Sequence, residues 1–127
     1  MDRFEFVALV ERAVDTLPEG FKKKLDNVAM VVEDWPTEEQ LRRLRIRGTL
    51  FGLYEGIPQT KRGTGYSGVL PDKITIFQKP IERYALDEAD MIRQIQQTVE
   101  HEIGHHFGLS EHEARRRDQR KQGKIDS

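Results

Sequence analysis

The sequence predicts a small protein of the α/β (α+β) class, in which short strands alternate with amphipathic helices. Some segments space their apolar residues three and four apart, as a helix with one buried face does, and others are short runs rich in β-branched residues, as buried strands are. The chain has 127 residues, the size of one compact domain with a single core. Because no repeat or low-complexity linker divides it, residues 1–127 are expected to form one domain.

Residues 6–17 are predicted to form the first helix, which Pro18 ends. Its apolar stripe consists of Val7, Val10, Val14 and Leu17. Residues 27–32 are a run of mostly apolar and β-branched residues, which predicts the first strand. Since this run is apolar on both faces, we expect the strand at the centre of the sheet.

A short helix is expected from Thr37, which can cap a first turn of acidic residues, to about Arg45. Residues 50–55 and 73–77 are predicted to be the second and third strands. The segment 56–68 between them is rich in glycine. We interpret it as a surface loop, because it lacks the spacing of a phosphate-binding loop and has no helix start after it.

The longest predicted helix begins at Asp87, where acidic residues suit the positive end of the helix dipole, and Gly108 is well placed to end it. Its apolar stripe consists of Ile92, Ile95, Val99 and Ile103. A last helix, highly charged, is expected over about 110–121.

Charge and composition narrow the classes of function. The 21 Lys and Arg residues nearly balance the 22 Asp and Glu residues, so no overall field favours nucleic acid or an anionic membrane as a partner. The basic run at 115–121 has no interleaved aromatic residues and is interpreted as a solvated helix face. There is no cysteine, which leaves His, Asp and Glu as strong metal ligands. No window is long and apolar enough to span a bilayer, so we expect a cytoplasmic protein with no membrane partner.

All four histidines lie between positions 101 and 112, and His101, Glu102 and His105 match the pattern H-E-x-x-H. Residues four apart on a helix are about 40° apart around its axis, so His101 and His105 can point two imidazoles at one ion. They lie opposite the apolar stripe, which lets the helix bury one side and form the floor of a cleft with the other. The pattern predicts a Zn2+ site.

A catalytic zinc ion takes a third protein ligand, with water completing its shell. Gly108 can turn the chain after the helix and bring Glu111 back towards the ion, and the adjacent His112 and Glu113 are also chemically able to bind. Glu102 would lie beside the metal without binding it. Zinc lowers the pKa of bound water from about 9 to about 7 in favourable sites, and a neighbouring carboxylate can accept its proton during attack on a carbonyl. The implied reaction is peptide hydrolysis.

The stretch His-Glu-Ile-Gly-His-His-Phe-Gly-Leu at 101–109 resembles the zincin metallopeptidases. Its extended form, H-E-x-x-H-x-x-G-x-x-E, is similar to the metzincin signature with the third histidine replaced by an acid. Together with Gly52-Leu-Tyr-Glu-Gly56 and Pro71-Asp-Lys-Ile74, it makes most of the chain resemble a family of small bacterial single-domain zincin-like proteins, long described as a domain of unknown function.

This resemblance implies a minimal zincin-like fold, in which a small mixed sheet of three to four strands packs with an N-terminal helix and a long active-site helix. It implies a zinc metallopeptidase with His101, His105 and Glu111 as metal ligands and Glu102 as general base. It also implies that substrate is held as an added strand along a sheet edge, either at residues 50–55 or in the loop near Tyr66.

The chain departs from the metzincins in one respect. They place a methionine turn beneath the metal after the third ligand, whereas the methionines here are Met1, Met30 and Met91. Only 16 residues follow Glu111, so we expect proteolysis to be weak or restricted.

Several nearby side chains have less specific interpretations. His106 points about 100° away from His105 and is expected to pack or cap rather than bind metal. A phenol from Tyr54, Tyr66 or Tyr84 could stabilise an oxyanion, but each tyrosine is interpreted as a core or rim residue.

The first functional hypothesis is a zinc-dependent peptidase acting on a flexible peptide or an unfolded protein segment. The alternative is a metal-binding interaction domain with little or no proteolytic turnover. A nucleic-acid accessory role for the basic run at 115–121 is the least favoured. The sequence specifies neither the substrate nor the oligomeric state.

Overall fold

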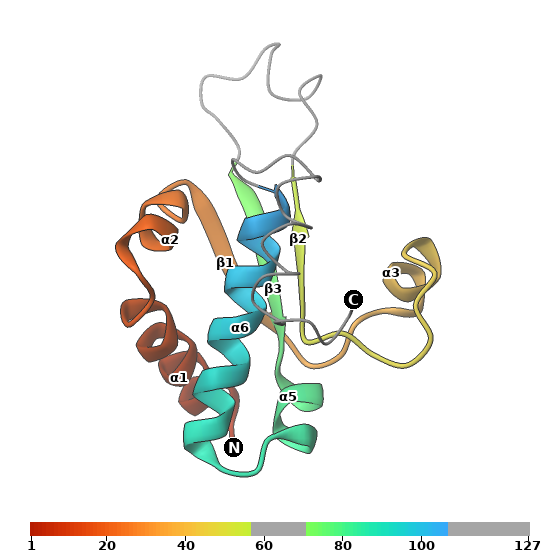
Figure 1. Cartoon of the computed structure of the whole chain (residues 1–127). Helices are drawn as coiled ribbons and strands as arrows, with labels where there is room; N and C mark the ends of the chain where they lie inside the picture. The colour runs from red at the N-terminus through yellow and green to blue at the C-terminus, as the bar shows by residue number, and fades with distance from the viewer. Residues whose placement is uncertain (57–70, 107–127) are drawn as a thin grey trace, which may run out of the picture.

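The computed structural model describes residues 1–56 and 71–106, which form a mixed sheet flanked by helices (Figure 1). In chain order the elements are α1 (Arg3–Asp15), α2 (Glu19–Lys24), β1 (Val28–Glu33), α3 (Glu38–Arg43), β2 (Gly52–Glu55), β3 (Asp72–Phe77), α5 (Gln78–Tyr84) and α6 (Glu88–His106). The predicted α/β (α+β) class, with its small mixed sheet, N-terminal helix and long helix, is confirmed. None of the helices in these two ranges is both long and apolar enough to cross a lipid bilayer.

The strand order is β1-β3-β2, with β1 parallel and β2 antiparallel to β3. The prediction that the strand at 27–32 is central was therefore wrong, because β3 takes that place and β1 is an edge strand of the described sheet. β3 is buried on both faces, through Ile74 and Ile76 on one and Thr75 and Phe77 on the other, whereas no residue of β1 is fully buried. An apolar run on two faces does not distinguish the middle of a small sheet from a partly covered edge.

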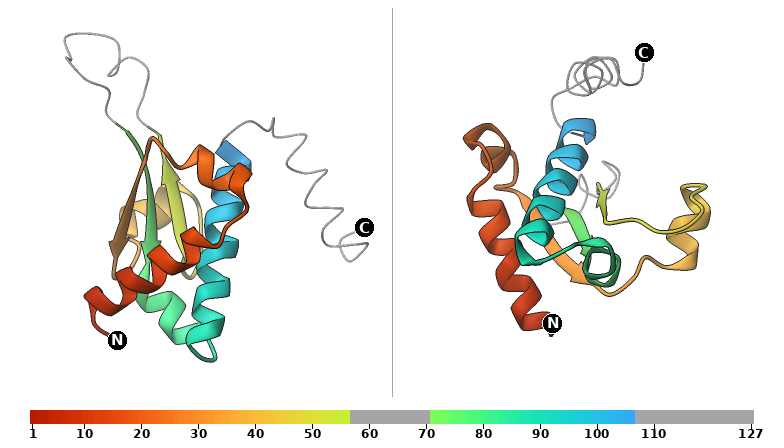
Figure 2. Two further views of the ribbon diagram at one scale, coloured as in Figure 1. Left: turned by 90° about the vertical axis from the view of Figure 1, so that its left-hand side faces the viewer. Right: turned by 60° about the horizontal axis from the view of Figure 1, so that its bottom comes forward.

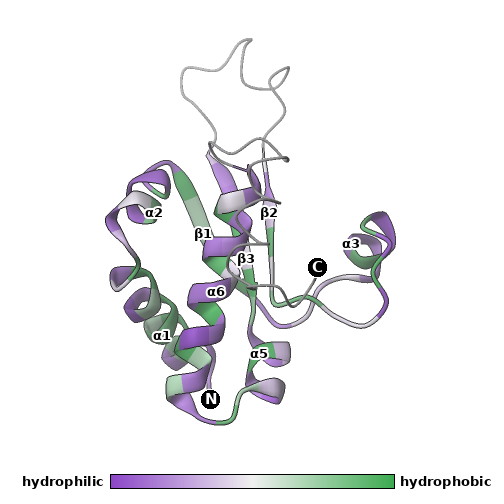
Figure 3. Ribbon diagram, in the orientation of Figure 1, coloured by the Kyte–Doolittle hydropathy of each residue, from purple (hydrophilic) through white to green (hydrophobic). Residues whose placement is uncertain are grey.

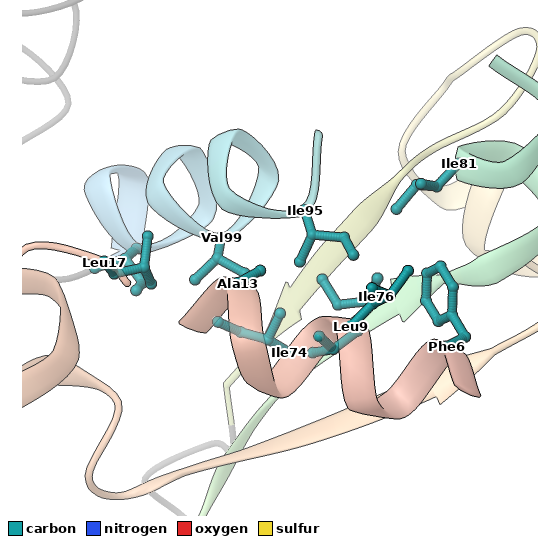
Figure 4. Packing of buried hydrophobic residues seen from close by; sticks show 11 residues of the cluster. Phe6, Leu9, Ala13, Leu17, Ile74, Ile76, Ile81, Ile95 and Val99 are labelled. Atoms are coloured by element: carbon teal, nitrogen blue, oxygen red, sulfur yellow. The ribbon is translucent and has the colours of Figure 1, made fainter. Parts of the chain in front are cut away.

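Helices α1 and α6 pack against each other and cover one face of the sheet (Figure 2). The core between them joins α1, β3, α5 and α6, and Figure 4 shows most of its side chains meeting there. Its buried members are Phe6, Leu9, Val10, Ala13, Leu17, Ile74, Ile76, Ile81, Ile95, Val99 and Ile103. Burying these side chains is the main favourable term that fixes α6 against the sheet.

The apolar stripe predicted for the long helix is confirmed, although Ile92 at its start is only partly buried. Ile95, Val99 and Ile103 are fully buried, and the hydropathy colouring of α6 alternates between its two sides (Figure 3). The helix begins where the Asp87 carboxylate accepts the main-chain N–H of Asp90 at 2.8 Å, the expected form of an N-terminal cap. The opposite side of α6 stays exposed and carries the candidate ligands.

Two short helices were not predicted. Periodicity could not find α2 or α5, because six and seven residues are fewer than two helical turns and each lies beside or contains a proline. The first helix was predicted in part. Val10 in α1 and Leu17 just after it are buried as expected, whereas Val7 and Val14 are only half-buried and the buried face of α1 also uses Phe6 and Leu9. The helix predicted at 110–121 and the loop beyond Gly56 lie outside the described residues.

Candidate metal centre

His101 and His105 lie side by side on the exposed side of α6. Their ring centroids are 4.4 Å apart and their planes are inclined by 64°. The four-residue spacing and the burial of the opposite stripe together turn both imidazoles to the same patch of solvent. This arrangement suits a zinc ion, which takes imidazole nitrogen readily and prefers ligands that converge from different directions.

A catalytic zinc ion would need a third protein ligand beside these two histidines. Within 1–56 and 71–106, no three His, Asp or Glu side chains are grouped closely enough to hold a metal ion. Glu111, the predicted third ligand, lies outside the described residues, as do the alternatives His112 and Glu113.

Glu102 lies next to the histidine pair but on the side of α6 that faces the sheet, and its side chain is half-buried. Its Oε1 atom accepts the main-chain N–H of Tyr54 in β2, at 2.6 Å. Burial raises the pKa of Glu102 above its ordinary value, while the Tyr54 N–H and the charges of neighbouring histidines act in the opposite direction. One carboxylate oxygen is thus held by the sheet, and Glu102 also lines the cleft that His101 borders.

A glycine lets α6 come this close to β2. A Cβ atom at Gly52 would lie 2.4 Å from the Thr98 methyl group in α6 and 3.2 Å from the main-chain oxygen of Thr75 in β3. Both distances are shorter than an ordinary van der Waals contact, so a larger residue would push the helix away from the sheet. Glu102 reaches the edge of β2 because this position has no side chain.

Sequence reasoning missed a polar cluster beside Glu102. The Tyr54 hydroxyl donates to Asp72 Oδ2 at 2.7 Å, and His106 Nε2 lies 3.7 Å from the same oxygen. The ring of His106 stacks on that of Tyr54, with centroids 3.9 Å apart and planes 21° apart. His106 therefore packs, as expected. In the sequence, Asp72 stands out only as an acidic residue at the start of an apolar strand. Nothing in the sequence indicates that it contacts a tyrosine 18 positions away.

An open cleft of about 500 Å³ runs alongside the candidate centre. It lies between α6 and the segment that leads into β2, and it is lined by Thr49, Leu50, Phe51, Gly52, Gln94, Gln97, Thr98, His101 and Glu102. The cleft thus has the general-base candidate and one metal-ligand candidate in its wall. β2 is an edge strand of the described sheet, whereas Tyr66, the other predicted position of a substrate-binding edge, lies outside the described residues.

The remaining predicted side chains lie apart from the histidine pair. Tyr84 is 63% exposed and contacts the ring of Phe51 with a centroid separation of 5.9 Å, which places it at the rim as expected. The basic run at 115–121 lies outside the described residues.

A search of curated proteins found no match to the chain. A protein-family model described as zincin-like metallopeptidase matches residues 25–120, which span the sheet, α6 and the complete H-E-x-x-H-x-x-G-x-x-E stretch. The match covers about three quarters of the 127 residues. The chain belongs to the zincin-like metallopeptidase family.

Proposed function

We propose that this protein is a zinc-dependent metallopeptidase that hydrolyses peptide bonds. His101, His105 and Glu111 would hold the ion, and Glu102 would act as general base. The observation that carries the proposal is a pair of adjacent, solvent-facing imidazoles on one helix, with the half-buried carboxylate of Glu102 and the ring of His101 lining the same cleft.

Zinc, when bound, supplies the Lewis acidity that lowers the pKa of a water molecule and polarises a carbonyl group. The part left to the protein is proton transfer. Glu102 would accept the proton of the attacking water, which is the general-base role that a carboxylate beside the ion can take. The Tyr54 N–H holds one oxygen of Glu102, so the carboxylate keeps its orientation during the transfer.

The cleft beside Glu102 supports a peptide or unfolded protein segment as the substrate. Apart from His101 and Glu102, its lining is uncharged. The cleft lies between α6 and the segment that leads into the edge strand β2, to which an extended chain can add. An open cleft of this kind favours a flexible chain, which can adopt the extended conformation that the edge requires. The proposal involves neither a membrane nor a nucleic acid.

The test is cleavage of a peptide library by the zinc-loaded protein, compared with Glu102→Gln. We expect the wild type to cleave and the variant to lose at least about a hundredfold in kcat while it keeps its zinc, since general-base catalysis contributes about 10²–10⁴. Glu100→Gln is the matched control, because it makes the same change on α6 outside the cleft lining and should cleave normally.

Two results would oppose the proposal. Equal cleavage by Glu102→Gln would remove Glu102 from the role of base. A zinc-loaded wild type that cleaves nothing would favour the alternative, a metal-binding interaction domain without useful turnover.

A further inference from the structure

Residues 101–106, at the C-terminal end of the described part of α6, carry two pairs of side chains that point in different directions. The members of each pair are four residues apart. His101 and His105 face solvent, whereas Glu102 and His106 both contact Tyr54. Glu102 accepts the main-chain N–H of Tyr54, and the ring of His106 stacks on its phenol ring. The helix that carries the candidate ligands is thus attached to one residue of the edge strand at two successive turns.

Tyr54 is in turn attached to the central strand through Asp72. Tyr54 pairs with Ile74, and Asp72 lies two residues before Ile74, so the pleat places Tyr54 and Asp72 diagonally on the same face of the sheet. The phenol donates to Asp72 Oδ2 at 2.7 Å, and His106 Nε2 lies 3.7 Å from that oxygen. Asp72 is only 8% exposed, so these contacts form where water competes little for the carboxylate.

Gly56 leaves the room that this arrangement needs. A Cβ atom there would lie 3.2 Å from His106 Cε1 and 3.6 Å from Asp72 Oδ1. The first of these contacts is tight, so the imidazole would have to give way. The backbone at the end of β2 is therefore shaped to admit the ring of His106 beside the carboxylate.

We propose that Tyr54, Asp72 and His106 form a clamp that positions the last described turns of α6, and that Asp72 and Tyr54 are positioning residues for zinc binding and for Glu102. The apolar stripe ends at Ile103 and fixes how deeply the helix is buried. The clamp adds a directional contact at the next turn, which fixes rotation and tilt. Its role in turnover rests on the proposed peptidase function, whereas its role in ordering the histidine turn does not.

The size of the effect follows from how sensitive metal sites are to ligand orientation. Outer-shell residues that hydrogen-bond directly to metal ligands change metal affinity or activity by about 10–100-fold when they are replaced. The clamp acts on His101 and His105 through the backbone of the same helix, so we take the lower end of that range. Misplacing reacting groups by about 1 Å can cost a hundredfold in rate. We therefore expect losses of at least about tenfold in zinc affinity when the clamp is broken.

The test uses the full chain with two conservative substitutions. Tyr54→Phe removes only the phenol oxygen and keeps both the ring stacking and the main-chain N–H, and Asp72→Asn removes the charge at constant size. Each has a matched control in the same chain. Tyr84→Phe removes an exposed phenol, and Asp90→Asn alters an equally buried carboxylate at the other end of α6.

Three readouts are taken. Zinc affinity is measured by competition with a chelator, and amide hydrogen exchange over residues 101–106 is measured in the metal-free protein. Unfolding free energy is measured in parallel, to separate ordering of the site from overall stability. If a cleaved peptide is known, kcat and KM are added, and the expected loss lies in kcat.

We expect Tyr54→Phe and Asp72→Asn each to weaken zinc binding at least about tenfold and to speed exchange at 101–106, with the double variant no worse than the more affected single variant. Asp90→Asn should lower the unfolding free energy but should leave zinc affinity and hydrogen exchange at 101–106 unchanged. Zinc affinity within twofold of wild type in both clamp variants, with unchanged exchange, would overturn the proposal. So would a loss of affinity that simply follows unfolding free energy across all four variants. Failure of the peptidase proposal alone would appear as absent cleavage with these binding and exchange results intact.

Discussion

At the level of the single residue, opposing effects act on the pKa of Glu102. Burial against β2 disfavours its charge, while the Tyr54 N–H and the nearby histidines favour it, and burial is the larger effect. A carboxylate that is held partly out of water costs stability when ionised, which is a common property of catalytic groups.

Replacing Glu102 with glutamine should therefore stabilise the metal-free protein at pH 7. The raised pKa means that the folded state binds a proton at Glu102 more tightly than the unfolded chain does. The penalty is absent below the ordinary pKa of about 4.3 and grows as the pH rises through the folded-state pKa. Glutamine carries no charge and can still accept the Tyr54 N–H. Urea unfolding at pH 7 and near pH 4 measures the difference, and equal stability of the two proteins at pH 7 would contradict this account.

Gly52 decides how closely the site helix approaches the edge strand. Gly52→Ala should lower the unfolding free energy by about 1–3 kcal/mol, because the new methyl group would meet Thr98 at 2.4 Å. Adding Thr98→Ser removes the opposing methyl group and keeps the hydroxyl that donates to the Gln94 carbonyl, so it should recover part of the loss. Gly20→Ala is the control, since nothing lies near its added Cβ. Additive effects of the two substitutions in chemical denaturation would show that no such contact exists.

At the level of the element, α6 carries three features along its length: a capped N-terminal end, a buried apolar stripe and the candidate metal ligands. Its N-terminal end is fixed by polar contacts: the Asp90 carboxylate accepts the Leu86 N–H at 2.9 Å and meets Arg93 at 3.2 Å. The far end is fixed against β2 and β3. A helix attached at both ends can present His101 and His105 in a constant orientation.

The Asp90 contacts should make stability depend on acidity. The hydrogen bond from the Leu86 N–H is the main reason that the pKa of Asp90 lies below its ordinary value, and the positive charge of Arg93 lowers this pKa further. Burial of the carboxylate acts in the opposite direction. This contribution is complete above the ordinary pKa of about 3.9 and is lost as the pH falls through the folded-state pKa. The unfolding free energy of the wild type should thus fall more steeply below pH 4 than that of Asp90→Asn. Parallel curves for the two proteins would exclude this role for Asp90.

For the whole molecule, the sequence could predict what periodicity and spacing encode. The stripe of α6 extends over several turns, so its helix, its buried face and the exposed pair His101 and His105 could all be inferred from the sequence. Strand order could not, because burial patterns report how covered a strand is and not which neighbours it has. The central place of β3 is the result that this reasoning missed.

The candidate site divides in the same way. The H-E-x-x-H spacing is local and readable, but the contacts from Tyr54 to Glu102 and to Asp72 join residues 48 and 18 positions apart. Contacts at such separations arise from strand pairing and the packing of α6, which no local pattern encodes. Glu111 as third ligand stays a prediction, since it lies outside the described residues.

Zinc binding by the purified protein tests the central claim most directly. After exchange into metal-free buffer and titration with zinc, elemental analysis and calorimetry should give one zinc ion per chain in the wild type and in Glu102→Gln. The double variant His101→Ala, His105→Ala should bind none with comparable affinity while it keeps the wild-type circular dichroism spectrum. A wild type that takes up no zinc near neutral pH, or a double variant that binds it as tightly, would contradict the account.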